Sequence, residues 1–173
     1  KAHTIRARQI AQYNDPNDPT SPASTLFPSQ FAFSTIGTIR TSGLINGLRV
    51  TSGRITRFQP GTDVLALNMT LSGPLNTLRI NGSLANNSSI FAGSINNLTV
   101  TRDLIGTVRT AGRMGNVTIG GNLAGSIQVD GTARGAALNS LRVGGGIRGG
   151  SINVVGNIGT IETSQGLGDS TAD

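Results

Sequence analysis

The sequence NNLTVTRDLIGTVRTAGRMGNVTIGGNLAGSIQV, residues 96–129, contains one apolar pattern twice. The matching positions of the two copies are Leu98, Val100 and Leu104 in the first, and Val117, Ile119 and Leu123 in the second. Apolar and polar residues alternate within each copy, which places the apolar side chains on one face of an extended strand. The stretch therefore predicts short β-strands that recur about every twenty residues and stack on one another in the core.

Further copies of this unit extend over most of the chain. Units of the form Leu/Val-x-Val/Ile followed by an apolar residue begin at Leu48, Leu78, Leu98, Val117 and Leu141, with spacings of 30, 20, 19 and 24 residues. A second, offset set with the pattern Gly-Ser/Thr-Ile/Val begins at Ile36, Ile105, Ala124 and Gly149. Each period therefore predicts two short strands separated by glycine, asparagine and serine.

Strands at this spacing, joined by turns too short for crossover helices, predict an all-β, single-stranded parallel β-solenoid. We expect about six coils with about 20 residues per coil, and a right-handed path because parallel crossovers usually have that hand. The glycines are expected at sharp turns that need positive φ. Asparagine columns such as Asn97 and Asn116 are expected to stack their amides from coil to coil.

The repeat predicts the domain boundaries. Residues 33–163 form the solenoid, residues 1–32 an N-terminal arm or cap, and residues 164–173 a flexible tail. The arm is rich in Pro, Asn, Asp and Ser, which predicts an extended segment. Its first part, AHTIRARQIAQY, fits either a short helix or a strand that covers the open end of the solenoid. Departures from the period at residues 60–74 and 130–137 predict loops that project outward.

Composition limits the function. The chain has 173 residues, a net charge of +6, no cysteine and only 3% aromatic residues, so its core must be aliphatic and it forms no disulfides. The basic residues are not clustered in the sequence, so we expect no specific nucleic-acid role. No apolar run approaches the roughly 20 residues of a membrane-spanning helix, so no transmembrane segment is expected.

The sequence offers few residues for catalysis. The single histidine, His3, lies in the predicted arm and is expected to be a plain solvated side chain. The carboxylates are dispersed, and the repeat aligns Asp103 with Asn122 and not with Asp130, which argues against a shared acid/base site. GGGIRG at residues 144–149 opens no helix, so we interpret it as a turn and not as a dinucleotide-binding loop. We therefore expect no enzymatic activity, no cofactor and no metal site.

The outward position of each unit is the candidate binding surface. One predicted ladder contains Arg49, Arg79, Thr99, Thr118 and Arg142, and the other contains Arg40, Arg109, Gln128, Asn153 and Glu162. Stacked coils place equivalent residues about 4.8 Å apart. The arginines Arg40, Arg49, Arg79, Arg109 and Arg142 are thus candidates for gripping an acidic polysaccharide or phosphate. The alternative is an ordinary solvated strand surface.

Two units carry a family resemblance. GNVTIGGNLAGSIQVDG and GGSINVVGNIGTIET resemble the G-x-[VI]-x-[VI]-x-G-x-L-x-G-[ST]-I repeats of very large exported bacterial proteins. More distantly, they are similar to the β-helix repeats of filamentous haemagglutinins and autotransporter passengers. The resemblance covers residues 33–163 and implies an extracellular stalk, adhesin or fibre module at the bacterial cell surface.

The combined expectation is a non-enzymatic structural or adhesive module. We expect it to associate with copies of itself through the solenoid ends or the N-terminal arm, and to contact acidic polysaccharide or the cell surface. The first alternative is an anionic-polysaccharide-binding module that uses the arginine and threonine ladders. A carbohydrate-active enzyme on a β-helix is the less favoured alternative.

Overall fold

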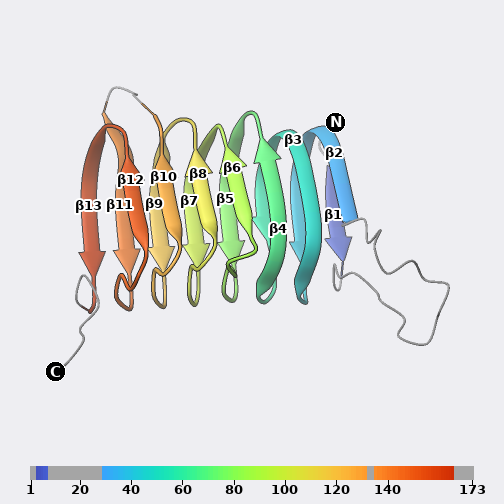
Figure 1. Ribbon diagram of the computed structural model, residues 1–173. Helices are drawn as coiled ribbons and strands as arrows, with labels where there is room; N and C mark the ends of the chain where they lie inside the picture. The colour runs from blue at the N-terminus through green and yellow to red at the C-terminus, as the bar shows by residue number, and fades with distance from the viewer. Residues whose placement is uncertain (1–2, 8–28, 132–134, 166–173) are drawn as a thin grey trace.

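The computed structural model of the chain is a parallel β-solenoid of about six turns with no helix in its described part (Figure 1). It describes residues 3–7, 29–131 and 135–165. The strands are β1 His3–Ala7, β2 Ser29–Thr41, β3 Ile45–Gln59, β4 Val64–Leu71, β5 Pro74–Ile80, β6 Ser89–Ala92, β7 Ser94–Val100, β8 Thr107–Thr110, β9 Met114–Ile119, β10 Ser126–Val129, β11 Ala136–Val143, β12 Ser151–Val154 and β13 Asn157–Thr163. This confirms the predicted fold class and the coil length of about twenty residues.

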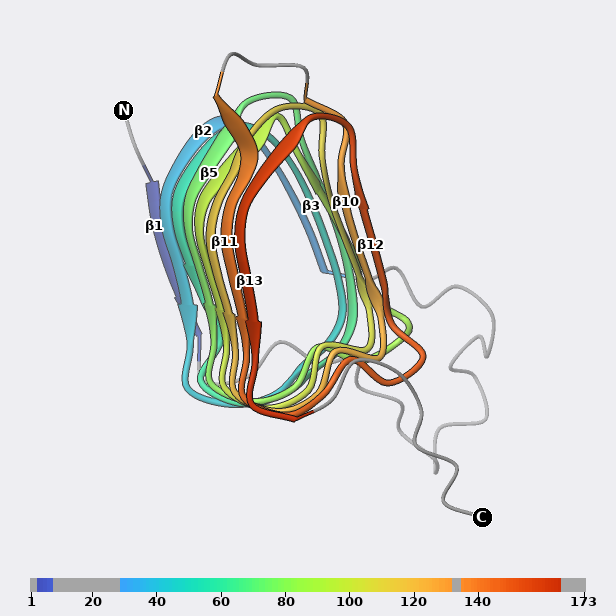
Figure 2. The same ribbon diagram turned by 90° about the vertical axis from the view of Figure 1, so that its left-hand side faces the viewer.

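The strands form two faces (Figure 2). The first face contains residues 29–33 of β2 and 48–52 of β3, followed by β4, β6, β8, β10 and β12. The second face contains β1, residues 35–41 of β2 and 54–59 of β3, followed by β5, β7, β9, β11 and β13. Because β2 and β3 are long enough to bend across both faces, these two coils join the faces into one sheet.

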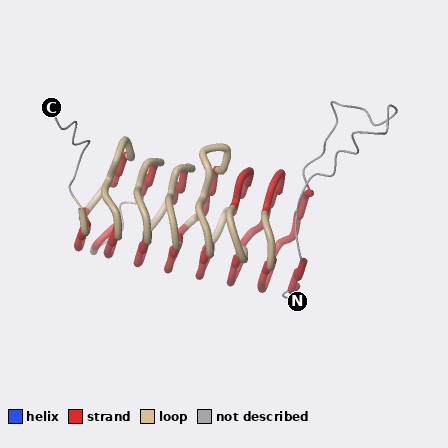
Figure 3. Tube along the Cα trace, turned by 90° about the horizontal axis from the view of Figure 1, so that it is seen from below, coloured by secondary structure: helices blue, strands red, loops and turns tan. Residues whose placement is uncertain are grey.

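Each coil has a third side, where the chain passes from a second-face strand to the next first-face strand. On this side, neighbouring coils are joined by a parallel bridge at one residue per coil. These bridges join, in order, Val64, Leu84, Leu104, Leu123 and Ile147, at intervals of 20, 20, 19 and 24 residues. Figure 3 shows the coils following one another along one axis with their turns aligned. The last interval is longer partly because residues 130–135 connect β10 to β11, whereas the shorter segment 111–113 connects β8 to β9.

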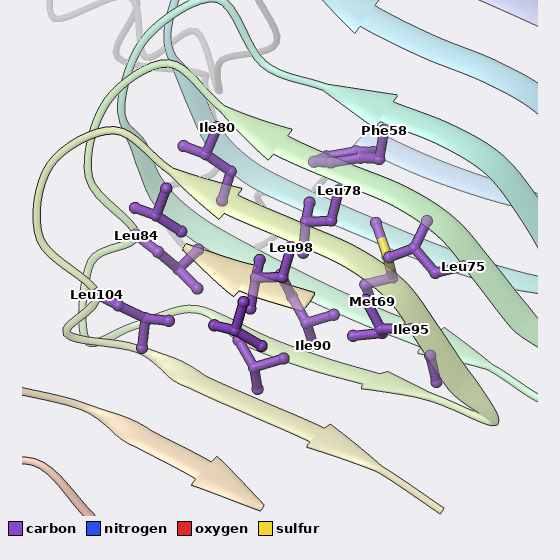
Figure 4. Close-up of a cluster of buried hydrophobic side chains, with 14 of the residues drawn as sticks. Phe58, Met69, Leu75, Leu78, Ile80, Leu84, Ile90, Ile95, Leu98 and Leu104 are labelled. Atoms are coloured by element: carbon purple, nitrogen blue, oxygen red, sulfur yellow. The ribbon is translucent and has the colours of Figure 1, made fainter. Parts of the chain in front are cut away.

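The core consists of stacked columns of aliphatic side chains (Figure 4). The paired positions of the two copies in residues 96–129 are Leu98 with Val117, Val100 with Ile119, and Leu104 with Leu123. All six side chains are buried, which confirms the predicted stacking. Each such side chain contributes about 1.5–3 kcal/mol through burial. Phe58 is the only aromatic residue among the buried core residues of the described chain, so aliphatic packing carries this core.

The strands of the second face depart from strict alternation. In β7, Ile95 and Leu98 both point into the core, with two exposed residues, Asn96 and Asn97, between them. The same spacing occurs in β5 and β9. Only the last three residues of each strand alternate with period two, as predicted. This bend gives the second face one additional outward row of side chains.

Most glycines are explained by close contact between coils. Positive φ occurs in the described chain only at Gly47, Gly135, Gly149 and Gly156. At most of the other described turns, a Cβ added to glycine would meet a backbone carbonyl of the preceding coil. The prediction that glycine serves mainly to reach positive φ is therefore wrong for most positions.

The prediction that residues 60–74 form an outward loop is wrong. This segment contains β4, whose side chains Val64, Leu67, Met69 and Leu71 are buried. The apparent spacing of 30 residues arose because Leu48 belongs to the first face, where it pairs with Leu67, and not to the face of Leu78. For the second predicted loop, residues 130–137, residues 132–134 lie outside the described residues and β11 already begins at Ala136.

The N-terminal segment adds a strand to the sheet. β1 pairs in parallel with residues 36–41 of β2, so the strand alternative holds for residues 3–7. β2 begins at Ser29, four residues before the predicted start of the solenoid at residue 33. β13 ends at Thr163. Residues 8–28 of the predicted arm and residues 166–173 of the predicted tail lie outside the described residues.

Candidate functional site

Three residues of the two predicted ladders lie on the opposite face from the other members of their ladder. Arg40 pairs with Gln59 on the second face, and Arg49 pairs with Asn68 on the first. Glu162 pairs with Arg142 on the second face and not with Asn153. The assignment of these three residues to their ladders was therefore wrong. The motif around Arg40, IGTIRTSG, resembles the motif around Arg109, IGTVRTAG. However, Arg40 lies on the second face and Arg109 lies on the first face.

Three of the five candidate arginines share one outward row of the second face. The strand register, continued by one residue beyond the pair Phe58 and Leu78, gives the row Arg40, Gln59, Arg79, Thr99, Thr118, Arg142 and Glu162. Arg49 and Arg109 lie on the first face in two different rows. The structure thus brings Arg40, Arg79 and Arg142 into line, but neutral residues separate them.

Arg109 is held by its neighbours on the first face. Its Nε donates to Oδ2 of Asp130 at 2.6 Å, and its guanidinium lies 5.7 Å from the centre of the Phe91 ring. Gln128 donates from Nε2 to the other carboxylate oxygen of Asp130 at 2.8 Å. The hydrogen bonds from Arg109 and Gln128 hold the pKa of Asp130 below its ordinary value. This arginine is therefore largely committed to contacts within the protein.

Arg142 is also paired with a carboxylate. Its Nε lies 3.0 Å from Oε2 of Glu162 on the next coil. Both side chains are exposed, so the pair contributes little to stability, but it cancels the charge of the row at this end. Thr118, Arg142 and Glu162 line a shallow depression of about 340 Å³.

Neutral amides orient the other two arginines of the row. Nη2 of Arg40 donates to Oε1 of Gln59 at 2.9 Å, and Nε of Arg79 donates to Oδ1 of Asn81 at 3.1 Å. These bonds position each guanidinium and leave its charge uncompensated. Two further arginines of the second face, Arg54 and Arg57, lie nearby on β3 and are exposed. They fall outside the Leu-x-Val motif, so the search for motif positions missed them.

Asparagine columns run beside this row, as predicted. Nδ2 of Asn116 lies 3.5 Å from Oδ1 of Asn97, and Nδ2 of Asn139 donates to Oδ1 of Asn116 at 2.8 Å. Asn76 and Asn96 form a similar pair at 3.4 Å. These contacts link successive coils through exposed side chains, so the outer surface follows the same register as the core.

The carboxylates at the third side bind backbone groups. Oδ1 of Asp63 accepts the N–H of Ser83 at 2.7 Å, and Oδ1 of Asp103 accepts the N–H of Asn122 at the same distance. The predicted alignment of Asp103 with Asn122 is confirmed. Each carboxylate bridges one coil to the next, which is a structural role. Within residues 3–7, 29–131 and 135–165, no three His, Cys, Asp or Glu side chains are grouped to hold a metal ion.

A hollow lies on the edge of the first face near its N-terminal end. It has a volume of about 530 Å³ and is lined by Ala32, Phe33, Ser34, Thr51, Ser52, Gly53, Thr70, Leu71, Ser72 and Phe91. The lining consists of apolar, glycine and hydroxyl-bearing residues and contains no charged residue. The side chain of His3 lies outside the described residues.

Comparison with protein-family models, with curated proteins and with solved structures found no match to this chain. The described part of the chain contains no helix that is long and apolar enough to cross a membrane. The structural evidence for function therefore comes from the geometry of the solenoid itself.

Proposed function

We propose that this chain is a non-enzymatic structural module of an extracellular or cell-surface assembly. The observation that carries the proposal is the open strand edge at β13. Ile158 and Ile161 continue core columns whose preceding members, Leu138 and Leu141, are buried, yet they are 43% and 39% exposed. Val155 at the same end is 48% exposed.

This edge is built to receive another coil. The side of β13 opposite β11 has no strand partner among the described residues. Apolar side chains and unpaired backbone groups together form a template for strand addition. We propose that a second copy of the chain docks here, end to end, and that such stacking generates a fibre or layer. The likeness of the repeats to exported bacterial surface proteins supports an extracellular location.

Sedimentation velocity and electron microscopy of the purified chain over a range of concentrations test the proposal. Concentration-dependent, end-to-end oligomers are expected, and the double variant Ile158→Lys/Ile161→Lys should abolish them. Thr160→Lys, on an outward position of the same strand, is the matched control and should leave assembly intact. A chain that stays monomeric at high concentration would remove the proposal of self-assembly.

A further inference from the structure

The second face carries a concentrated basic patch at its N-terminal end. We define this basic patch as Arg40 on β2, Arg54 and Arg57 on β3, and Arg79 on β5. The three strands are direct neighbours, and all four side chains are exposed. Adjacent strands lie about 4.8 Å apart, so the four guanidinium groups fall within reach of one extended ligand. The backbone register also places Arg6 beside Arg40.

The positive charge of the basic patch is not compensated within the described protein. The ion pairs among the described residues are Arg109 with Asp130 and Arg142 with Glu162, both toward the C-terminal end. Arg40 and Arg79 bond only to neutral amide oxygens, and the described strands β2, β3 and β5 contain no Asp or Glu. Among the arginines on the strands of the second face, those at the N-terminal end are thus without an ion pair, whereas Arg142 at the other end is paired.

The surroundings of the basic patch are rich in hydroxyl and amide groups. Thr38 and Thr77 flank Arg57 in its outward row, which continues with Asn97 and Asn116. Thr99 and Thr118 follow Arg79 in the neighbouring row. A linear ligand that lies along the solenoid axis therefore meets arginines first and hydrogen-bonding side chains beyond them.

We propose that the basic patch binds an acidic polysaccharide through its sulfate or carboxylate groups. Guanidinium groups bind such oxyanions with paired, charge-assisted hydrogen bonds. The threonine and asparagine rows are suited to the hydroxyl groups of the same chain. This inference goes beyond the structural role proposed above and does not depend on self-assembly. The proposed binding residues differ from the predicted motif positions because they include Arg54 and Arg57.

The geometry favours polysaccharide over nucleic acid. Single-stranded nucleic acids are bound largely by stacking of bases on aromatic side chains. Phe58 is the only aromatic residue in the second-face segments of β2, β3 and β5, and it is buried. The flat, hydroxyl-rich face therefore suits an extended sugar chain.

Binding of heparin, used as the sulfated probe, tests the proposal by titration at low and high salt. The double variant Arg57→Gln/Arg79→Gln should weaken binding about tenfold or more at low salt, because charge-assisted contacts are lost. Arg109→Gln/Arg142→Gln removes the same net charge from the paired arginines and should change affinity less than about twofold. Neutral dextran should not bind, and thermal unfolding should show that both variants are folded.

Three results would overturn the proposal. The first is the absence of salt-sensitive heparin binding by the wild-type chain. The second is an equal loss of affinity in both double variants, which would reduce the effect to net charge. The third is binding of duplex or single-stranded DNA that is as tight as heparin binding and equally sensitive to Arg57→Gln/Arg79→Gln. Measuring the same samples by sedimentation separates loss of binding from loss of assembly.

Discussion

At the scale of single residues, close packing between coils selects glycine at the ends of the second-face strands. A Cβ at Gly120 would meet the carbonyl oxygen of Thr101 and lie 3.0 Å from its carbonyl carbon. One coil later, a Cβ at Gly144 would meet the backbone of Gly120 in the same way. Because the obstacle is backbone, neither side can yield without moving a coil. The composition showed that glycine is abundant, but only the stacked structure shows this reason for it.

Gly120→Ala should therefore destabilise the solenoid. We expect a loss of about 1–3 kcal/mol in the free energy of unfolding, because overpacking forces the backbone to shift. Chemical denaturation measured by circular dichroism gives this value. Thr118→Ala, at a nearby outward position, should change it by less than about 0.5 kcal/mol. Equal stability of Gly120→Ala and the wild-type chain would contradict close packing at this turn.

The ion pair of Asp130 makes a second residue-level prediction, on pH. The pKa of Asp130 is held below its ordinary value of 3.8 by Arg109 first and Gln128 second, so the fold favours the charged carboxylate. This contribution is complete above about pH 5 and is lost as the pH falls through the lowered pKa. Removing the guanidinium should bring the pKa back toward 3.8.

NMR titration of the Asp130 carboxyl carbon measures this pKa directly. In Arg109→Gln it should be higher than in the wild-type chain. Arg142→Gln removes an arginine that is paired with a different carboxylate and should leave the pKa of Asp130 unchanged. An unchanged value in Arg109→Gln would show that the 2.6 Å contact does not persist in solution.

At the scale of elements, each coil is fastened to the next at its third side. Asp103 accepts the N–H of Asn122, and Asn122 in turn accepts the N–H of Gly146 at 3.1 Å. Asn122 thus repeats the role of Asp103 one coil later with a neutral oxygen. The bridge needs an acceptor at this position and does not need a charge.

Two substitutions at Asp103 should show whether its hydrogen-bond acceptor or its negative charge stabilises the fold. Asp103→Ala leaves the N–H of Asn122 without its partner and should lower the free energy of unfolding by about 1–2 kcal/mol. Asp103→Asn keeps the acceptor and should lower it by less than half of that amount. Thermal or chemical unfolding of the two variants gives the comparison. An equal loss in Asp103→Asn and Asp103→Ala would show that the acceptor alone is not enough and that the charge itself matters.

The assignment of strands to faces marks the limit of what the sequence predicts. Leu98 and Val117 were paired correctly because their units are complete and lie 19 residues apart. Leu48 and Arg40 were misplaced because strands of both faces share the pattern apolar-x-apolar. Local pattern identifies a strand, whereas its face is decided by which neighbouring coil completes the column. In the first two coils, β2 and β3 run across both faces, so the motif alone could not decide to which face a residue belongs.

At the scale of the whole molecule, the arginines on the strands of the second face differ along the solenoid axis in whether they form ion pairs. Free arginines occupy the β2, β3 and β5 end of the second face, whereas Arg109 and Arg142 are paired toward the β13 end. The sequence predicted the candidate arginines but not this separation, because the partners of Arg109 and Arg142 are 21 and 20 positions away along the chain. Only the stacking of coils brings those carboxylates into contact.

The central claim is that coils of about twenty residues stack in one register, and disulfide trapping tests it most directly. The chain has no cysteine, so pairs can be introduced without interference. Thr99 and Thr118 are paired on adjacent strands, whereas Thr99 and Arg142 are two strands apart, about 10 Å, which exceeds the reach of a disulfide. Under mild oxidation, Thr99→Cys/Thr118→Cys should form an intramolecular disulfide and Thr99→Cys/Arg142→Cys should not. Cross-linking of the second pair, or failure of the first pair in folded protein, would contradict the register on which the whole account rests.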